Sequence, residues 1–120
     1  GDPRTDNRLF RADGGVVLVD WSLIGHAHPG FDVGYLLSSS LSTERIGRRG
    51  DLVRHYEDVL AGHGVDLDGR SLRTAIDATY RSIAVQQLMS IDVLNNESYG
   101  DDSMYDLWMP RLLAGMAEHW

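Results

Sequence analysis

The sequence predicts a helix-dominated α+β domain, an N-terminal β-hairpin followed by about four helices. Two observations favour this class. Residues 8–21 place two short apolar stretches on either side of an Ala-Asp-Gly-Gly turn, which is typical of a hairpin. Beyond residue 30, apolar residues recur at helical spacing in four segments. With 120 residues and 42% hydrophobic content, the chain can form one core.

The hairpin is expected to pair a strand at Leu9 and Phe10 with a strand over residues 16–19. The second stretch is continuously apolar and rich in valine, which predicts a strand buried on both faces. It ends at Asp20, and a carboxylate buried there would need a cation or hydrogen-bond donors. Residues 22–30 contain two glycines, a proline and two histidines, which indicates an irregular loop.

Asp32 is placed to begin the first helix, either as its N-cap or as a first-turn carboxylate facing the helix dipole. The second helix is expected over residues 49–63, with Gly62 and Gly64 as its stop signal. Its apolar face is expected to hold Leu52, Val53, Tyr56, Val59 and Leu60.

Ser71 is expected to cap a long third helix that runs to about Leu94. A last helix is expected over residues 103–119. The spacing predicts that both helices contribute aromatic and aliphatic residues to the core, namely Leu72, Ile76, Tyr80, Ile83 and Leu88 in the third and Met104, Trp108, Leu112 and Met116 in the fourth.

The composition excludes several classes of function. Eleven basic and 18 acidic residues give a net charge of −7, which argues against nucleic-acid binding. All basic residues are arginine, and cysteine is absent, so disulfides and thiolate metal sites are excluded. No apolar run reaches the roughly 20 residues of a membrane span. We expect a cytoplasmic protein without a membrane or nucleic-acid partner.

Asp2, Asn7 and Asp20 form the main candidate site. A tight hairpin returns its second strand to the neighbourhood of its first, so Asp20 can approach Asn7. Carboxylate and amide oxygens suit Mg²⁺, and Asp2 would be available to orient or deprotonate a hydroxyl. Together these residues predict phosphoryl transfer. The competing interpretation is that such side chains only cap helices and form turns.

Three motifs carry a resemblance to a known family: G-D-x-R-x-D-N-x-L-F at the start, then V-V-L-V-D-W, then P-G-F-D-V-G-Y-L-L. Over residues 1–41 the chain resembles the C-terminal lobe of the aminoglycoside phosphotransferase and choline-kinase-like superfamily, which shares the protein-kinase fold. The resemblance implies that Asp2 is the catalytic aspartate and that Asn7 and Asp20 bind Mg²⁺. It implies that Asp32 braces the catalytic loop.

The resemblance also implies ATP and Mg²⁺ as cofactors and a small-molecule hydroxyl as phosphoryl acceptor. Residues 1–30 would hold the catalytic loop, hairpin and metal loop, and residues 31–120 a helical subdomain. The family's loop histidine would directly precede Gly1, and the N-terminal lobe with its ATP-anchoring lysine has no counterpart in this lysine-free chain. We therefore expect a fragment of a kinase with little activity alone.

Four residues are candidates for acceptor binding. Arg4 lies in the catalytic loop, while Glu97, Asp101 and Asp102 form an acidic loop before the last helix. Gathered carboxylates attract cations, so a cationic hydroxyl acceptor is one hypothesis and a solvated loop is the other.

Two other functions stay open at the level of sequence. The chain could be a non-catalytic, kinase-like helical binding module. Alternatively, His26, His28 and Asp20 could bind zinc in a metal-dependent hydrolase.

Overall fold

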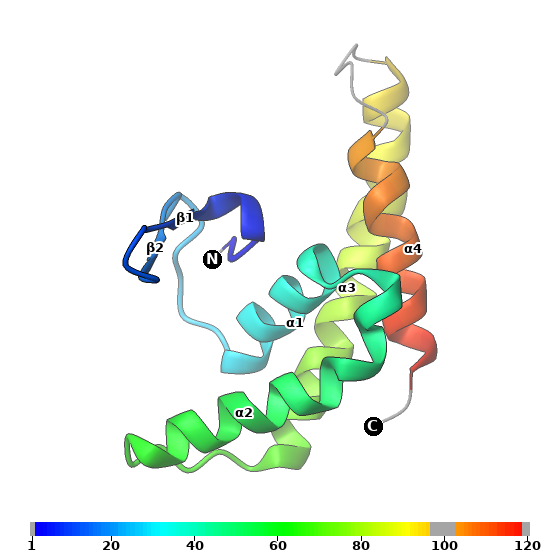
Figure 1. Cartoon of the computed structure of the whole chain (residues 1–120). Helices are drawn as coiled ribbons and strands as arrows, with labels where there is room; N and C mark the ends of the chain where they lie inside the picture. The colour runs from blue at the N-terminus through cyan, green and yellow to red at the C-terminus, as the bar shows by residue number, and fades with distance from the viewer. Residues whose placement is uncertain (1, 97–102, 119–120) are drawn as a thin grey trace.

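An N-terminal hairpin lies beside a body of four α-helices in the computed structural model, which describes residues 2–96 and 103–118 (Figure 1). The predicted helix-dominated α+β class is confirmed. The side chains of residues 90–107 are not described. Within the described ranges, no helix combines the length and the apolar character needed to cross a lipid bilayer.

The hairpin forms where the sequence predicts it. A short 3₁₀ helix, η1 (Thr5–Asn7), leads into β1 (Arg8–Phe10), which pairs antiparallel with β2 (Val16–Leu18). The turn between the strands uses the left-handed region at Gly14, with φ of 85°. Glycine adopts this conformation without steric cost, which explains the Gly-Gly pair.

The prediction that the second strand is buried on both faces is wrong. All three β2 residues are exposed, and Phe10 on β1 is 69% exposed. The hairpin lies to one side of the helices (Figure 1), and no described element covers it. Its valines fit a strand through their β-branched shape, and this preference does not require burial.

Helix α1 (Pro29–Ser40) begins three residues before the predicted start. His28 is its N-cap, because His28 Nδ1 accepts a hydrogen bond of 3.0 Å from the Gly30 amide. Pro29 then occupies the first helical position, where its missing N–H has no cost. Asp32 is therefore the first-turn carboxylate and not the N-cap.

A second 3₁₀ helix, η2 (Thr43–Arg48), runs directly into α2 (Arg49–Gly62). The predicted glycine stop is confirmed. Gly64 has φ of 77°, and its amide donates to the Ala61 carbonyl at 2.9 Å. This bond satisfies one of the carbonyl groups that the end of a helix otherwise leaves unpaired.

Helix α3 (Gly69–Asn96) is capped by Asp68, so the prediction of Ser71 as the cap is wrong. The two Asp68 carboxylate oxygens accept from the Arg70 amide at 3.2 Å and the Ser71 amide at 3.1 Å. The Asp68-Gly69 pair therefore begins the helix three residues earlier than expected. Helix α4 (Ser103–Ala117) follows and runs alongside α3 (Figure 1).

The core lies where α1, α2, α3 and α4 meet. Tyr80 and Trp108 are buried in this core, as predicted. Leu88 and Met116 are 55% and 44% exposed, so their prediction as core residues is wrong. On α2, Val53 is fully buried while Leu52 and Val59 are more than 40% exposed, because this helix contacts the body mainly near its start. The buried apolar cluster comprises Leu37, Val53, Leu72, Ile76, Tyr80, Ile83, Trp108 and Leu112.

Helices α1 and α3 approach closely because two glycines face α3. A Cβ atom at Gly30 would lie 2.6 Å from the Cβ of Ala75. A Cβ atom at Gly34, one turn later, would lie 2.8 Å from the Cβ of Thr79 and 3.1 Å from the Ile76 carbonyl oxygen. Neither contact is sterically allowed without moving backbone, so the two glycines set the distance between the helices.

We expect Gly34→Ala to lower the free energy of unfolding by about 1–3 kcal/mol, as overpacking of a tight interior does. The measurement is equilibrium denaturation in urea. Gly62→Ala is the matched control, because no atom lies within 4 Å of the added Cβ and alanine is favoured over glycine in a helix. Equal stability of the two variants would show that the α1–α3 distance adjusts freely.

Candidate functional site

Residues 2–7 form a loop that is closed by its own hydrogen bonds. The Asn7 amide N–H donates to the Arg4 carbonyl at 3.1 Å, and Asn7 Nδ2 donates to the Asp2 carbonyl at 2.9 Å. Arg8 Nη2 donates to the Pro3 carbonyl at 3.1 Å. Because the side-chain Nδ2 of Asn7 is bonded inside the loop, the side-chain Oδ1 of Asn7 is the atom that can bind a cation.

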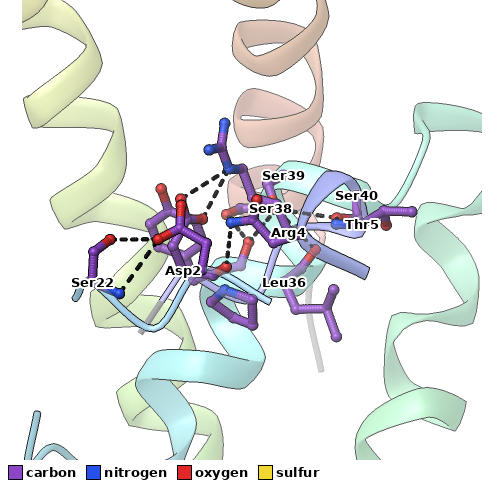
Figure 2. A network of polar contacts seen from close by, with 12 residues as sticks. Asp2, Arg4, Thr5, Ser22, Leu36, Ser38, Ser39 and Ser40 are labelled. Atoms are coloured by element: carbon purple, nitrogen blue, oxygen red, sulfur yellow. Dashed lines mark hydrogen bonds and ion pairs between the residues drawn. The ribbon is translucent and has the colours of Figure 1, made fainter. Parts of the chain in front are cut away.

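The loop is attached to the helical body at two points. The Thr5 amide donates to Ser40 Oγ at 3.0 Å, at the end of α1 (Figure 2). The Arg4 guanidinium lies 5.5 Å from the centre of the Trp108 ring in α4, a cation–π contact. Trp108 in turn meets the Tyr35 ring edge to face at 6.1 Å. The loop is thus held by both α1 and α4.

Asp2 faces Arg4 within the loop (Figure 2). Arg4 Nε lies 2.8 Å and 3.1 Å from the two carboxylate oxygens. The side chain of Asp2 is only 10% exposed, and a carboxylate at such a site needs a charged partner. Arg4 therefore fixes the orientation of Asp2. Burial, and then the nearby Asp2 charge, raise the pKa of Tyr35 beside this pair.

The end of the hairpin returns to the loop. The Val19 amide donates to the Asn7 carbonyl at 2.9 Å, so the residue before Asp20 is bonded directly to Asn7. Asp20 itself has φ of 61°, an uncommon conformation for a residue other than glycine. Such outliers occur most often at functional sites.

The carboxylate of Asp20 is exposed, so the expectation of a buried charge at the strand tip is wrong. The exposed hairpin leaves it accessible, and Ser22 supplies the hydrogen-bond donors. Both the Ser22 hydroxyl and its amide donate to Asp20 Oδ1. These bonds, the hydroxyl first, hold the pKa of Asp20 below its usual range.

Asp2, Asn7, Asp20 and Asp32 line one cavity of about 110 Å³. The loop of residues 2–7, the end of the hairpin and the first turn of α1 supply these four residues. The remaining lining is mostly apolar and comes from Pro3, Leu18, Val19, Trp21, Ile24 and Gly25. Three carboxylates and an amide around one cavity can bind a cation, orient a hydroxyl and accept its proton.

Hard oxygen ligands of this kind fit Mg²⁺, which keeps several waters and takes other ligands from phosphate. The described residues contain no group of three or more His, Cys, Asp or Glu side chains placed to hold a metal. The residues suited to Mg²⁺ are Asn7 and Asp20. The bracing role expected for Asp32 stays a prediction.

The structure gives His28 a role that differs from zinc binding. Its Nδ1 caps α1, and its Nε2 lies 3.3 Å from Ser71 Oγ. Both ring nitrogens therefore have partners within the protein, which disfavours a zinc site of His26, His28 and Asp20.

The sequence did not indicate which helix residues contact the loop of residues 2–7. Trp108 and Tyr35 have the spacing of core residues. Nothing in that pattern predicts that Trp108 contacts Arg4, which lies 104 positions earlier in the chain. Only the arrangement of α4 beside α1 brings them together. Glu97, Asp101 and Asp102 lie outside the described residues, so their expected role in acceptor binding stays a prediction.

We expect Ser22→Ala to raise the pKa of Asp20 toward its ordinary value, because the hydroxyl bond that stabilises the charged form is lost. A pH titration of the carboxyl carbon by NMR measures this shift. Ser82→Ala, an exposed change on α3, is the control and should leave Asp20 unaffected. An identical Asp20 titration in both variants would contradict the role of Ser22.

Comparison with known proteins identifies the family to which the chain belongs. The model of the phosphotransferase enzyme family matches residues 1–71, a range that contains every residue lining the cavity. No curated protein and no solved structure matches the chain. The family match covers more than half of the 120 residues and agrees with the predicted resemblance. The chain belongs to the phosphotransferase enzyme family.

Proposed function

We propose that this chain is the large-lobe part of an ATP- and Mg²⁺-dependent small-molecule kinase that transfers the γ-phosphoryl group to an acceptor hydroxyl. The observation that carries the proposal is the single cavity lined by Asp2, Asn7, Asp20 and Asp32. Family membership supports phosphoryl transfer as the chemistry.

Asp2 is the group that we assign to the acceptor. Arg4 holds its carboxylate in one orientation, and Asp2 lines the cavity. A carboxylate fixed in this way can accept a hydrogen bond from the acceptor hydroxyl, align its oxygen and take its proton. Positioning of this kind supplies much of the rate in phosphoryl transfer.

Asn7 and Asp20 are the groups that we assign to the metal. Asn7 Oδ1 and the Asp20 carboxylate would hold Mg²⁺, which would supply positive charge against the negative charge of the phosphates. Asn7 Oδ1 is directed by the Nδ2 bond to the Asp2 carbonyl. Asp20 is accessible, and the Ser22 hydrogen bonds that hold its pKa below the usual range stabilise its ionised form, which is the form that binds a cation.

We further propose that a second lobe completes the nucleotide site over the hairpin. The apolar residues Leu9, Phe10, Val17, Leu18, Trp21 and Ile24 are each more than 40% exposed, and apolar surface of this extent usually meets a partner. The chain also has no lysine to anchor the nucleotide phosphates. The 120 residues alone are expected to show little phosphotransferase activity.

In the full-length enzyme, Asp2→Asn is expected to lower kcat by about 10²–10⁴-fold, the contribution of a positioned acid or base. Asp13→Asn removes the same charge at an exposed hairpin turn, where Asp13 pairs with Arg11, and is the matched control. Steady-state kinetics decide the outcome. A kcat that is the same in both variants would remove Asp2 from the reaction.

Asp20→Asn is expected to raise the Mg²⁺ concentration that gives half-maximal nucleotide binding by about tenfold or more, because a charged ligand contributes more than a neutral one. Calorimetric titration with nucleotide at a series of Mg²⁺ concentrations measures this without turnover. If Mg²⁺ dependence stays that of the unaltered enzyme, the metal site lies elsewhere. Nucleotide binding without any turnover would favour the non-catalytic binding module.

The proposed acceptor is a hydroxyl compound with a cationic group, recognised by the acidic loop of Glu97, Asp101 and Asp102. The double variant Asp101→Asn/Asp102→Asn is expected to raise the acceptor KM several-fold while leaving the KM for ATP unchanged, since nearby opposite charge favours binding. An unchanged acceptor KM would dismiss the cationic acceptor and leave the phosphotransferase proposal intact.

A further inference from the structure

A second cavity lies away from the candidate site. Its volume is about 330 Å³, within the range of about 300–1,000 Å³ that is usual for small-molecule sites. It shares no lining residue with the first cavity. Residues from η2, α2, α3 and the end of α4 surround it, namely Ile46, Gly47, Arg49, Gly50, Arg54, Arg73 and Glu118.

The charged side chains that line this cavity are mostly basic. Three of its seven lining residues are arginines and one is acidic, although the chain has 18 acidic residues against 11 basic ones. Clefts lined by one sign of charge concentrate ligands of the opposite sign. The cavity is therefore suited to an anion.

Arg54 and Arg73 have donors available for that anion. Among the described residues, Arg54 pairs with Asp51 and Arg73 pairs with Glu57, each through Nη2 alone. A guanidinium carries five N–H donors, so each of the two keeps further donors. Asp51 and Glu57 do not line the cavity, so they neutralise these arginines without occupying its interior.

Arg49 fixes the shape of the cavity. It is 1% exposed, and its Nη1 and Nη2 donate to the carbonyls of Gly115 at 2.6 Å and Glu118 at 2.8 Å. Its guanidinium also lies 5.6 Å from the centre of the Tyr80 ring. Arg49 thereby joins the start of α2 to α3 and to the end of α4. Its Nη1 also lies 4.0 Å from Asp77 Oδ1, so the role of Arg49 is to shape the cavity and not to supply an unpaired charge.

We propose that this cavity binds the phosphate group of a small phosphomonoester, with Arg54 and Arg73 as its main ligands. Two guanidinium groups match the several oxygens of a phosphate dianion through paired hydrogen bonds. Glu118 lines the same cavity, so its carboxylate opposes binding and limits the affinity. This site is independent of the proposed kinase reaction, because none of its residues belongs to the first cavity.

The test is isothermal titration of the whole protein with inorganic phosphate, and then with glycerol 3-phosphate, at constant ionic strength. We expect saturable binding that Arg54→Gln and Arg73→Gln each weaken by about tenfold or more, as loss of a charged hydrogen bond does. Glu118→Gln should tighten binding. Arg81→Gln removes an exposed arginine on α3 outside the cavity and should leave it unchanged.

Three results would overturn the proposal: no saturable heat with phosphate, the same response to chloride, or phosphate affinity that is equal in Arg54→Gln, Arg73→Gln and Arg81→Gln. Circular dichroism checks that each variant folds. Arg54 is 65% exposed, so its substitution does not disturb the core. Should Arg73→Gln unfold, Arg73→Gln/Glu57→Gln removes both members of its ion pair, and Arg54→Gln alone still decides the question.

Discussion

The close approach of α1 to α3 is the constraint on which the rest of the structure depends. Gly30 and Gly34 present no side chain to α3, so the α1 backbone lies directly against the Cβ atoms of Ala75 and Thr79. Interiors pack as densely as organic crystals, so this contact fixes α1 firmly. The first turn of α1 carries Asp32 to the candidate site, and its last residue, Ser40, holds the Thr5 amide. The position of α1 therefore decides where the loop of residues 2–7 lies.

The loop of residues 2–7 is held by polar contacts more than by burial. Its own hydrogen bonds close it, Arg4 stacks over Trp108, and Val19 binds the Asn7 carbonyl. The network joins residues from the hairpin, α1 and α4. Buried polar groups with satisfied partners favour one conformation over others, and a site for phosphoryl transfer needs such a fixed geometry. Asp20 differs from these residues because its side chain is exposed. Its accessibility suits a metal ligand.

The two cavities differ in charge and in construction. The first gathers Asp2, Asp20 and Asp32 with the amide of Asn7 and is suited to a cation. The second gathers Arg49, Arg54 and Arg73 and is suited to an anion. The net charge of −7 does not predict this separation, because it averages over both. Local charge at each cavity, and not the total, determines which ligand each can bind.

Much of this protein follows from the sequence alone. The Gly-Gly turn, the stop at Gly62 and Gly64, and the spacing of Leu72, Ile76 and Tyr80 are local features, so the hairpin, the four helices and much of the core could be predicted. The approach of Asp20 to Asn7 could also be predicted, because a tight hairpin joins them over few residues.

Tertiary structure alone decided the rest. Burial of the hairpin could not be inferred, because an apolar, valine-rich run has the same pattern whether or not another element covers it. The contact of Arg4 with Trp108 and the gathering of Arg49, Arg54 and Arg73 were also decided there. In the arginine cavity and at Trp108, helices far apart in the chain supply neighbouring side chains, and their packing is a property of the whole fold that local sequence patterns do not encode.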